Sequence, residues 1–180
     1  MERSLTMVAL FAALIAVLGL FPSFMLFTGV PISAQSFGVM LCGAVLGARK
    51  GALAVLLFLL LVALGLPLLA GGRGGLGAFV GPTSGFLYGF PVAAFVTGWI
   101  AQNWRGVSLT ISAAAGALIG GVGVLYAFGA AGMMLVIGLS LPEAVAALAA
   151  FIPGDIIKAV IAGVVTGAIY RARPGFVLTR

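Results

Sequence analysis

The chain has 180 residues, of which 63% are apolar and only 7% are charged, and its formal net charge is +6. Soluble domains hold roughly 45–50% apolar and about 25% charged residues, so the composition excludes an ordinary soluble domain and indicates an integral membrane protein. We expect a single domain, residues 1–180, with room for about six spanning helices of roughly 20 residues each.

Apolar runs along the chain predict an all-α fold with six transmembrane helices. The spans are expected at residues 5–20, 34–47, 51–65, 84–100, 109–131 and 154–170. A membrane β-barrel would alternate apolar and polar residues with a period of two, and runs such as residues 53–64 show no such alternation.

Basic residues gather where the predicted helices end, and this distribution predicts the orientation. With six spans both termini lie on one side, and seven basic residues fall there: Arg3, Arg49, Lys50, Arg105, Arg171, Arg173 and Arg180. Arg73 is then the one cation in a loop on the opposite side. Because cytoplasmic loops carry the excess of Lys and Arg, we expect both termini in the cytoplasm. Five or seven helices would divide these cations between the two sides.

The first predicted helix carries small residues at four-residue spacing, in the pairs Ala9 with Ala13 and Ala12 with Ala16. Such spacing lets another helix approach closely. This face could pack within its own bundle or bind a partner, and the residues leave both open. A secretory signal is the less favoured reading of this helix, since no clear small-residue cleavage site follows and more spans come after it.

Two segments on the outer side contain polar groups in apolar surroundings. Residues 29–37 place Gln35 near the outer start of the second helix, and residues 66–85 hold Arg73 among glycines. Loops longer than about 12–15 residues are usually functional or disordered, and this second loop is too apolar to be disordered. We expect it to fold back over the bundle as a lid, with glycines such as Gly74 and Gly75 lying close over a ligand. Alternatively, the glycines only permit tight helix entry.

Several classes of function are disfavoured by what the sequence contains and lacks. Residues 72–77 match the GxGxxG dinucleotide pattern, but no strand precedes them and no acidic residue follows about 20 positions later. There is no phosphate-binding GxxxxGK[ST] loop, no histidine, and only three acidic residues. The single Cys42 lies in an apolar stretch and predicts a buried side chain. We therefore expect neither an enzyme nor a metal or cofactor site, and cations spread over helix ends do not indicate a nucleic-acid binder.

Asp155 and Lys158 are two charges in an otherwise apolar run, just after Pro153 and Gly154. Three residues apart on a helix, they share one face, and ionisable groups inside a membrane segment are costly unless paired or hydrated. Arg171 lies sixteen positions after Asp155, about 24 Å along a helix, so the pair belongs to the outer part of the last span. It could be a substrate site or a structural ion pair that caps the helix.

A short helix is expected before the last span, at residues 142–151. Its length is too small to cross the membrane, so we expect it to lie across the outer mouth of the bundle. Glu143 falls in its first turn, where an anion is favoured.

Three segments together resemble one known family. They are VPISAQSF at residues 30–37, GGRGGLGAFVGPTSGFLYGF at residues 71–90 and PGDIIK at residues 153–158. In this order and spacing, and at this length, the chain resembles the BioY family, the biotin-specific S components of energy-coupling factor transporters. Four residues depart conservatively from the family's common pattern: Ser33, Ala34, Ser84 and Phe86.

The resemblance implies high-affinity capture of biotin from outside the cell and its import through the cell membrane. The implied partners are a transmembrane coupling subunit and two ATP-binding cassette ATPases, which agrees with the missing phosphate loop. In this family class the first helix contacts the coupling subunit, and that role maps here to Ala9, Ala13 and Ala16.

Biotin's own chemistry can be matched to the candidate residues. Its cyclic urea presents two N–H donors around one carbonyl acceptor, so Asp155 can accept from an N–H and Lys158 can donate to the carbonyl, with Gln35 completing that edge. Arg73 is the candidate for the carboxylate, unless it is a solvated loop residue. The thiophane ring would be walled by aromatic residues, for which the candidates are Phe37, Phe79 and Tyr88; packing or anchoring at the membrane interface is their alternative role.

Other functions stay open at this point. An S component for thiamin or riboflavin would predict more aromatic residues in the loops and no Asp/Lys pair. A channel or secondary transporter acting alone usually has broken helices in both halves with a site at the midplane, whereas this chain gathers its polar residues at one end. A purely structural membrane subunit would not need the outward pair.

Overall fold

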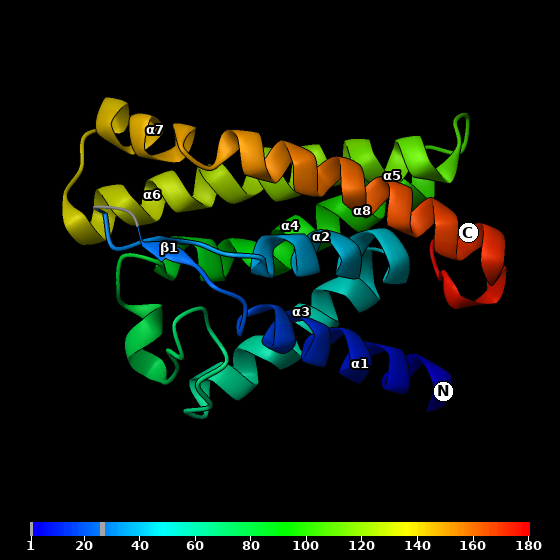
Figure 1. Cartoon of the computed structure of the whole chain (residues 1–180), viewed down its shortest axis with the longest axis horizontal. Helices are drawn as coiled ribbons and strands as arrows, with labels where there is room; N and C mark the ends of the chain where they lie inside the picture. Colours follow the sequence, from blue (N-terminus) through cyan, green and yellow to red (C-terminus); the bar gives the residue numbers. More distant parts are fainter. Residues whose placement is uncertain (1, 26–27) are drawn as a thin grey trace.

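The apolar runs of the sequence fold into helices in the computed structural model, which describes residues 2–25 and 28–180 (Figure 1). These described residues form six helical rods. Five of them are α1 (Glu2–Leu18), α2 (Gln35–Leu46), α3 (Ala48–Ala63), α4 (Ser84–Asn103) and α8 (Ile152–Ala172). The remaining rod joins α5 (Leu109–Leu118), the π-helical η2 (Ile119–Val124) and α6 (Leu125–Ile137).

Each of the six predicted helices is present, but several of the predicted ends were wrong. The fifth rod continues to Ile137 instead of ending at residue 131, and its π-helical turn was not predicted. Shorter elements complete the chain. They are the antiparallel strands β1 (Phe24–Met25) and β2 (Pro31–Ile32), the 3₁₀ turns η1 (Leu76–Phe79) and η3 (Pro174–Phe176), and α7 (Leu141–Ala149).

Three helices among the described residues are long and apolar enough to cross a membrane: Ser84–Asn103, Leu109–Ile137 and Ile152–Ala172. The 12-residue α2 is apolar but shorter. The chain is therefore an integral membrane protein with an all-helical fold.

The core is built around α2. A helix that is apolar on all sides tends to be buried, and ten of the twelve α2 residues are buried against α1, α3, α4 and α8. At Gly43 the missing side chain lets α2 pack directly on the α4 backbone at Ala94. This close approach follows the small-residue packing of membrane helices.

Both chain termini lie at the same end of the molecule (Figure 1). Arg3 donates to the Gly175 carbonyl, and the C-terminal segment is bound to the α2 C-terminus, where the Leu178 N–H donates to the Val45 carbonyl at 2.7 Å. Seven of the nine basic residues belong to helix ends and loops on this side, which we call the basic end. Arg73 and Lys158 belong to the opposite side, which we call the cavity end.

The short helix α7 was expected to lie across the outer mouth, and the structure differs. α7 packs against α6 and, after a two-residue turn, is followed by α8, with which it runs roughly in line (Figure 1). Only Phe151, in this junction, reaches the cavity described next.

Candidate ligand-binding site

A cavity opens at the cavity end between α2, α4, α6, α8 and the loop that follows α3. It encloses about 550 Å³ when the open solvent at its mouth is counted. Apolar side chains form most of its wall and a few polar groups converge on it, as in small-molecule sites. Its polar lining consists of Ser33, Gln35, Ser36, Arg73, Thr83, Asp155 and Lys158.

The Asp155–Lys158 pair forms one wall of this cavity. Pro153 lies in the first turn of α8, where its fixed backbone angle favours helix and no N–H is lost, so α8 begins early enough to hold both side chains on one face. Lys158 Nζ lies 2.8 Å from Asp155 Oδ1, and the side chains are 20% and 4% exposed. The pair is therefore nearly removed from solvent, as expected for a costly and functional charge in a membrane protein.

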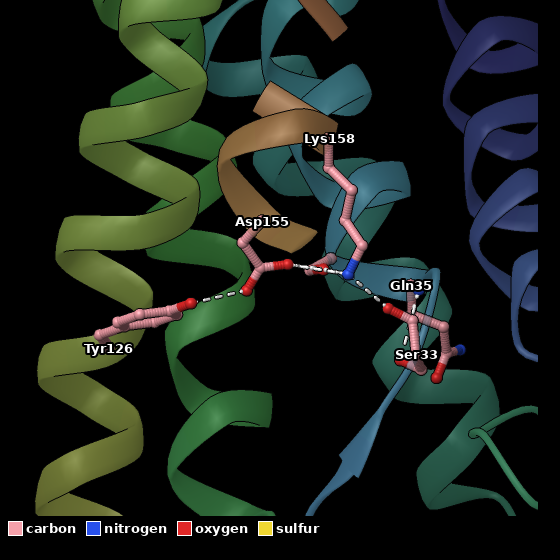
Figure 2. Close-up of polar contacts among 6 residues, drawn as sticks. Ser33, Gln35, Tyr126, Asp155 and Lys158 are labelled. Atoms are coloured by element: carbon pink, nitrogen blue, oxygen red, sulfur yellow. Dashed lines mark hydrogen bonds and ion pairs between the residues drawn. The ribbon is translucent and has the colours of Figure 1, made fainter. Parts of the chain in front are cut away.

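Three further residues hold the pair in place (Figure 2). Lys158 Nζ donates to the Ser33 carbonyl at 2.8 Å and to Ser36 Oγ at 3.1 Å. Asp155 accepts from Ser36 Oγ at 3.1 Å and, on its other oxygen, from the Tyr126 hydroxyl at 3.0 Å. Sequence reasoning missed Ser36 and Tyr126. Ser36 lay beside Gln35 in a quoted segment, but nothing local indicated that Tyr126, 29 residues before Asp155, would reach it.

Gln35 lines the cavity and also binds the loop after α3. Its Nε2 donates to the carbonyls of Ile15 at 3.2 Å and Leu68 at 3.0 Å, and its Oε1 accepts from the Ala70 N–H at 3.0 Å. The side chain is 3% exposed. Both amide hydrogens are thus used within the protein, and one acceptor position on Oε1 is left for a ligand.

Arg73 lies in that loop and lines the cavity as a half-buried cation. Its Nε donates to the Ala70 carbonyl at 3.2 Å, and the loop is closed by the Leu69 N–H, which donates to the Arg73 carbonyl at 2.9 Å. Burial lowers the pKa of the guanidinium from its ordinary value, but an arginine stays protonated at neutral pH. The end of the guanidinium therefore remains available for an anion.

The two glycines proposed beside Arg73 support the loop without lining the cavity. Gly74 packs its bare Cα against the Leu66 carbonyl. Gly75 has a positive φ of +80°, which starts the η1 turn, and its N–H donates to the Val62 carbonyl at 2.8 Å.

Aromatic residues wall the cavity, but from positions other than those proposed. The lining rings are Phe86, Phe90 and Phe151, and the centroids of Phe86 and Phe151 are 6.0 Å apart. Phe86 and Phe90 are four residues apart on α4, so they share a face, which is the signal that the sequence offered.

The proposed aromatic residues lie elsewhere. Phe37 packs against the hydrophobic core. Tyr88 and Phe79 line a separate groove beside α6, with the Tyr88 hydroxyl donating to the Phe79 carbonyl at 2.9 Å.

The small residues of α1 divide between two faces. Ala12 is buried in the bundle, whereas Ala9 and Ala13 are exposed and Ala16 is half-buried. The exposed face carrying Ala9 and Ala13 is flanked by Leu10 and Val17, both about half exposed.

Comparison with known proteins gives consistent matches along the whole chain. The family model described as "BioY family" matches residues 2–175. "Biotin transporter BioY" of Rhodobacter capsulatus is 52% identical over 189 residues, covering 100% of both chains. "Biotin transporter BioY" of Rhizobium etli is 51% identical and covers 96% of this chain and 95% of its own.

A solved structure is similar as well. The crystal structure of "the S-component for biotin from an ECF-type ABC transporter" superposes with a TM-score of 0.91 at 31% identity, covering 97% of this chain and 94% of that chain. Because the family model and the full-length relatives agree, the chain belongs to the BioY family.

Proposed function

We propose that this protein is a biotin-binding S component, a membrane subunit that captures biotin at the cavity end for uptake by an energy-coupling factor transporter. The observation that carries the proposal is the nearly buried Asp155–Lys158 pair on the wall of an otherwise apolar cavity. Relatives named biotin transporters, at about half identity over their full length, support the choice of ligand.

The hydrogen-bonding capacity of the pair suits a cyclic urea. Asp155 Oδ1 already accepts from Ser36 and Lys158, whereas Oδ2 accepts, among the described residues, only from Tyr126. A carboxylate oxygen has two acceptor positions, so Oδ2 is free to take one urea N–H. Gln35 Oε1 can accept the second N–H, since it accepts a single hydrogen bond within residues 2–25 and 28–180.

Lys158 has three donors, and all three are used in the cavity without ligand, toward Ser33, Ser36 and Asp155. The urea carbonyl must therefore replace one of these acceptors. Ser36 Oγ is the candidate for replacement, because it gives the longest of the three hydrogen bonds and its hydroxyl can turn away. The polar cluster is thus pre-organised for an acceptor at the position of the urea oxygen.

The other parts of biotin find complementary walls. Arg73 can bind the valerate carboxylate through the end of its guanidinium, a charge-assisted contact. Phe86, Phe90 and Phe151 supply apolar surface for the thiophane ring and the methylene chain. The loop that carries Arg73 would act as a lid over the bound biotin, and hydrogen bonds from Gln35 hold this loop in place.

The setting in the membrane completes the proposal. Six spans with both termini in the cytoplasm put the basic end inside and the cavity outside, in accord with the positive-inside pattern, and the membrane is the cell membrane. A coupling subunit would pack on the exposed α1 face at Ala9, Ala13 and Ala16, and two ATP-binding cassette ATPases would supply the energy.

Calorimetric titration of the detergent-purified protein tests the ligand. Biotin is expected to bind, and thiamin and riboflavin are not. Asp155→Asn keeps the shape but removes the charge, so it should weaken biotin binding by about 2 kcal/mol or more, roughly 30-fold.

Glu143→Gln is the matched control, because it makes the same chemical change at an exposed carboxylate on α7, outside the cavity. It should leave the affinity unchanged. Absence of biotin binding in the parent protein would refute the function. Equal affinities of the parent and Asp155→Asn would refute the site while leaving the function standing.

A further inference from the structure

A second groove lies at the basic end, where α3 begins beside the end of α4. Its walls include Arg49, Lys50, Phe95, Trp99, Gln102 and Leu178. It encloses about 960 Å³ with its open mouth included. The proposed biotin site uses none of these residues.

The floor of the groove is held by direct contact between backbones. Gly98 on α4 has no side chain, and the α2–α3 turn at Gly47 and Ala48 packs into the space. One turn further along α4, Gln102 Oε1 accepts from the Ala48 N–H at 3.1 Å. The start of α3 is therefore held against α4, and the basic side chains that follow lie beside the aromatic residues of α4.

Donors without protein acceptors line the polar half of the groove. Arg49 is exposed and Lys50 is half-buried, and within residues 2–25 and 28–180 neither side chain makes a hydrogen bond or an ion pair. Gln102 uses its oxygen on Ala48, while its Nε2 donates to no atom of the described chain. The groove thus offers two positive charges and an amide donor, and no acidic residue is part of its described lining.

The other half of the groove is apolar and opens outward. Phe95 and Trp99 are one turn apart on α4 and are 42% and 55% exposed. Tryptophan is enriched where membrane helices meet the headgroup region. Since the chain is a membrane protein and this groove lies at its basic end, we expect the cations near the lipid headgroups and the rings beside the acyl chains.

We propose that this groove binds one anionic glycerophospholipid. Its phosphate would contact Arg49, Lys50 and Gln102 Nε2, and its acyl chains would lie along Phe95 and Trp99. A zwitterionic lipid fits less well, because its ammonium group would find two cations and no carboxylate. A bare phosphate ion would leave the aromatic half of the groove unused.

Tryptophan fluorescence gives a direct test, since the chain has only two tryptophans. Trp104→Phe leaves Trp99 in the groove as the sole reporter. The variant is reconstituted in phosphatidylcholine vesicles that contain increasing fractions of either brominated phosphatidylglycerol or brominated phosphatidylcholine, whose bromines quench tryptophan on contact. Half-maximal quenching by brominated phosphatidylglycerol should need roughly 30-fold less lipid than quenching by brominated phosphatidylcholine, because each of two basic residues near the membrane surface contributes about fivefold.

Matched double variants separate the groove from general surface charge. In the Trp104→Phe background, Arg49→Gln with Lys50→Gln should abolish the preference, whereas Arg171→Gln with Arg173→Gln should keep it. The second pair removes the same charge from exposed positions outside the groove. If the first double variant does not fold by circular dichroism, Lys50→Gln alone should reduce the preference about fivefold and Arg49→Lys should retain it.

Several results would overturn the proposal. One is equal quenching by the two brominated lipids in the parent, and another is an equal loss of preference in both double variants. Displacement of the lipid by millimolar inorganic phosphate would assign the groove to a free anion. If neither brominated lipid quenched Trp99, the groove would be closed to lipid, for example because a protein partner covers it.

Discussion

The cavity end and the basic end of the bundle hold charge in different ways. At the cavity end, Asp155 and Lys158 are 2.8 Å apart, nearly buried, and bound by side chains or carbonyls from α2, α6 and the segment before α2. At the basic end, Arg49, Arg171 and Arg173 are exposed. A buried charge therefore needs partners from several elements, whereas an exposed one needs only a helix end.

Removing a charge should therefore have opposite consequences at the two ends. Lys158→Met keeps the length of the side chain but leaves Asp155 buried without its cation, so biotin affinity should fall by roughly 100-fold or more and stability should drop. Arg171→Met removes an exposed cation of the same helix. It should change biotin affinity by no more than about twofold and leave stability nearly unchanged. Calorimetry with biotin and thermal unfolding in detergent measure both.

If both methionine variants lost biotin affinity to the same extent, removal of a buried charge and of an exposed charge would have the same consequence, and the contrast between the two ends would be refuted. A stable Lys158→Met protein with unchanged affinity would show that the buried pair serves neither binding nor packing.

The contrast also explains what could be predicted from sequence. Cations at helix ends are a local feature, so their positions were predictable along with the existence of six helices. The partners of Asp155 were not, because Tyr126 reaches it from a rod that contains a π-helical turn, Ile119–Val124. A run such as IGGVGV carries no local signal that distinguishes a π turn from an α turn, and that turn sets which α6 side chains face α8.

The aromatic wall illustrates a second limit. Phe86 and Phe90 face the cavity, whereas Tyr88, between them in sequence, is 54% exposed. Their spacing predicts that Tyr88 lies on another face of α4. Which face points inward was not predictable, because α4 is apolar on all sides and lipid and core are equally apolar surroundings.

Glutamine side chains at the two ends allow a graded comparison of stability. Gln35 makes three hydrogen bonds to backbone groups at the cavity end, whereas Gln102 makes one at the basic end. Gln35→Leu should lower the free energy of unfolding by about 2–3 kcal/mol and Gln102→Leu by about 1 kcal/mol, because each leaves buried backbone groups unpaired.

Chemical unfolding in detergent measures the two losses, and hydrogen exchange at the Ala70 amide reports the loop directly. Exchange at Ala70 should speed up in Gln35→Leu only. Equal losses in the two variants, with Ala70 still protected, would mean that the loop is held by something other than Gln35.

Arg73 tests whether the loop at the cavity end recognises charge. Arg73→Gln should weaken biotin binding about tenfold, since it removes one charge-assisted hydrogen bond. Biotin methyl ester has no carboxylate and should bind the parent and the variant equally well. An equal loss for both ligands in calorimetry would instead assign Arg73 a structural role in the loop.

The smallest effect is expected at Glu143, an exposed anion at the cavity end whose partners are local. Glu143 Oε2 accepts from the Ser140 N–H at 2.8 Å and from the Ser140 hydroxyl at 2.6 Å, and these hydrogen bonds lower the pKa of Glu143 below its ordinary value of 4.5. Because the folded pKa is the lower one, the stabilisation is present above the unfolded pKa and is lost as the pH falls through the folded value.

Thermal unfolding of the parent and Glu143→Gln at about pH 7 and about pH 3 checks this dependence. At the higher pH the parent should be slightly more stable than Glu143→Gln, and at the lower pH the two should be equally stable. A difference that persists unchanged at the lower pH would show that the carboxylate is not the group responsible. With its acceptor three residues from its donor, Glu143 resembles the basic end in needing no tertiary partner, so location at the cavity end does not by itself make a charge costly; burial does.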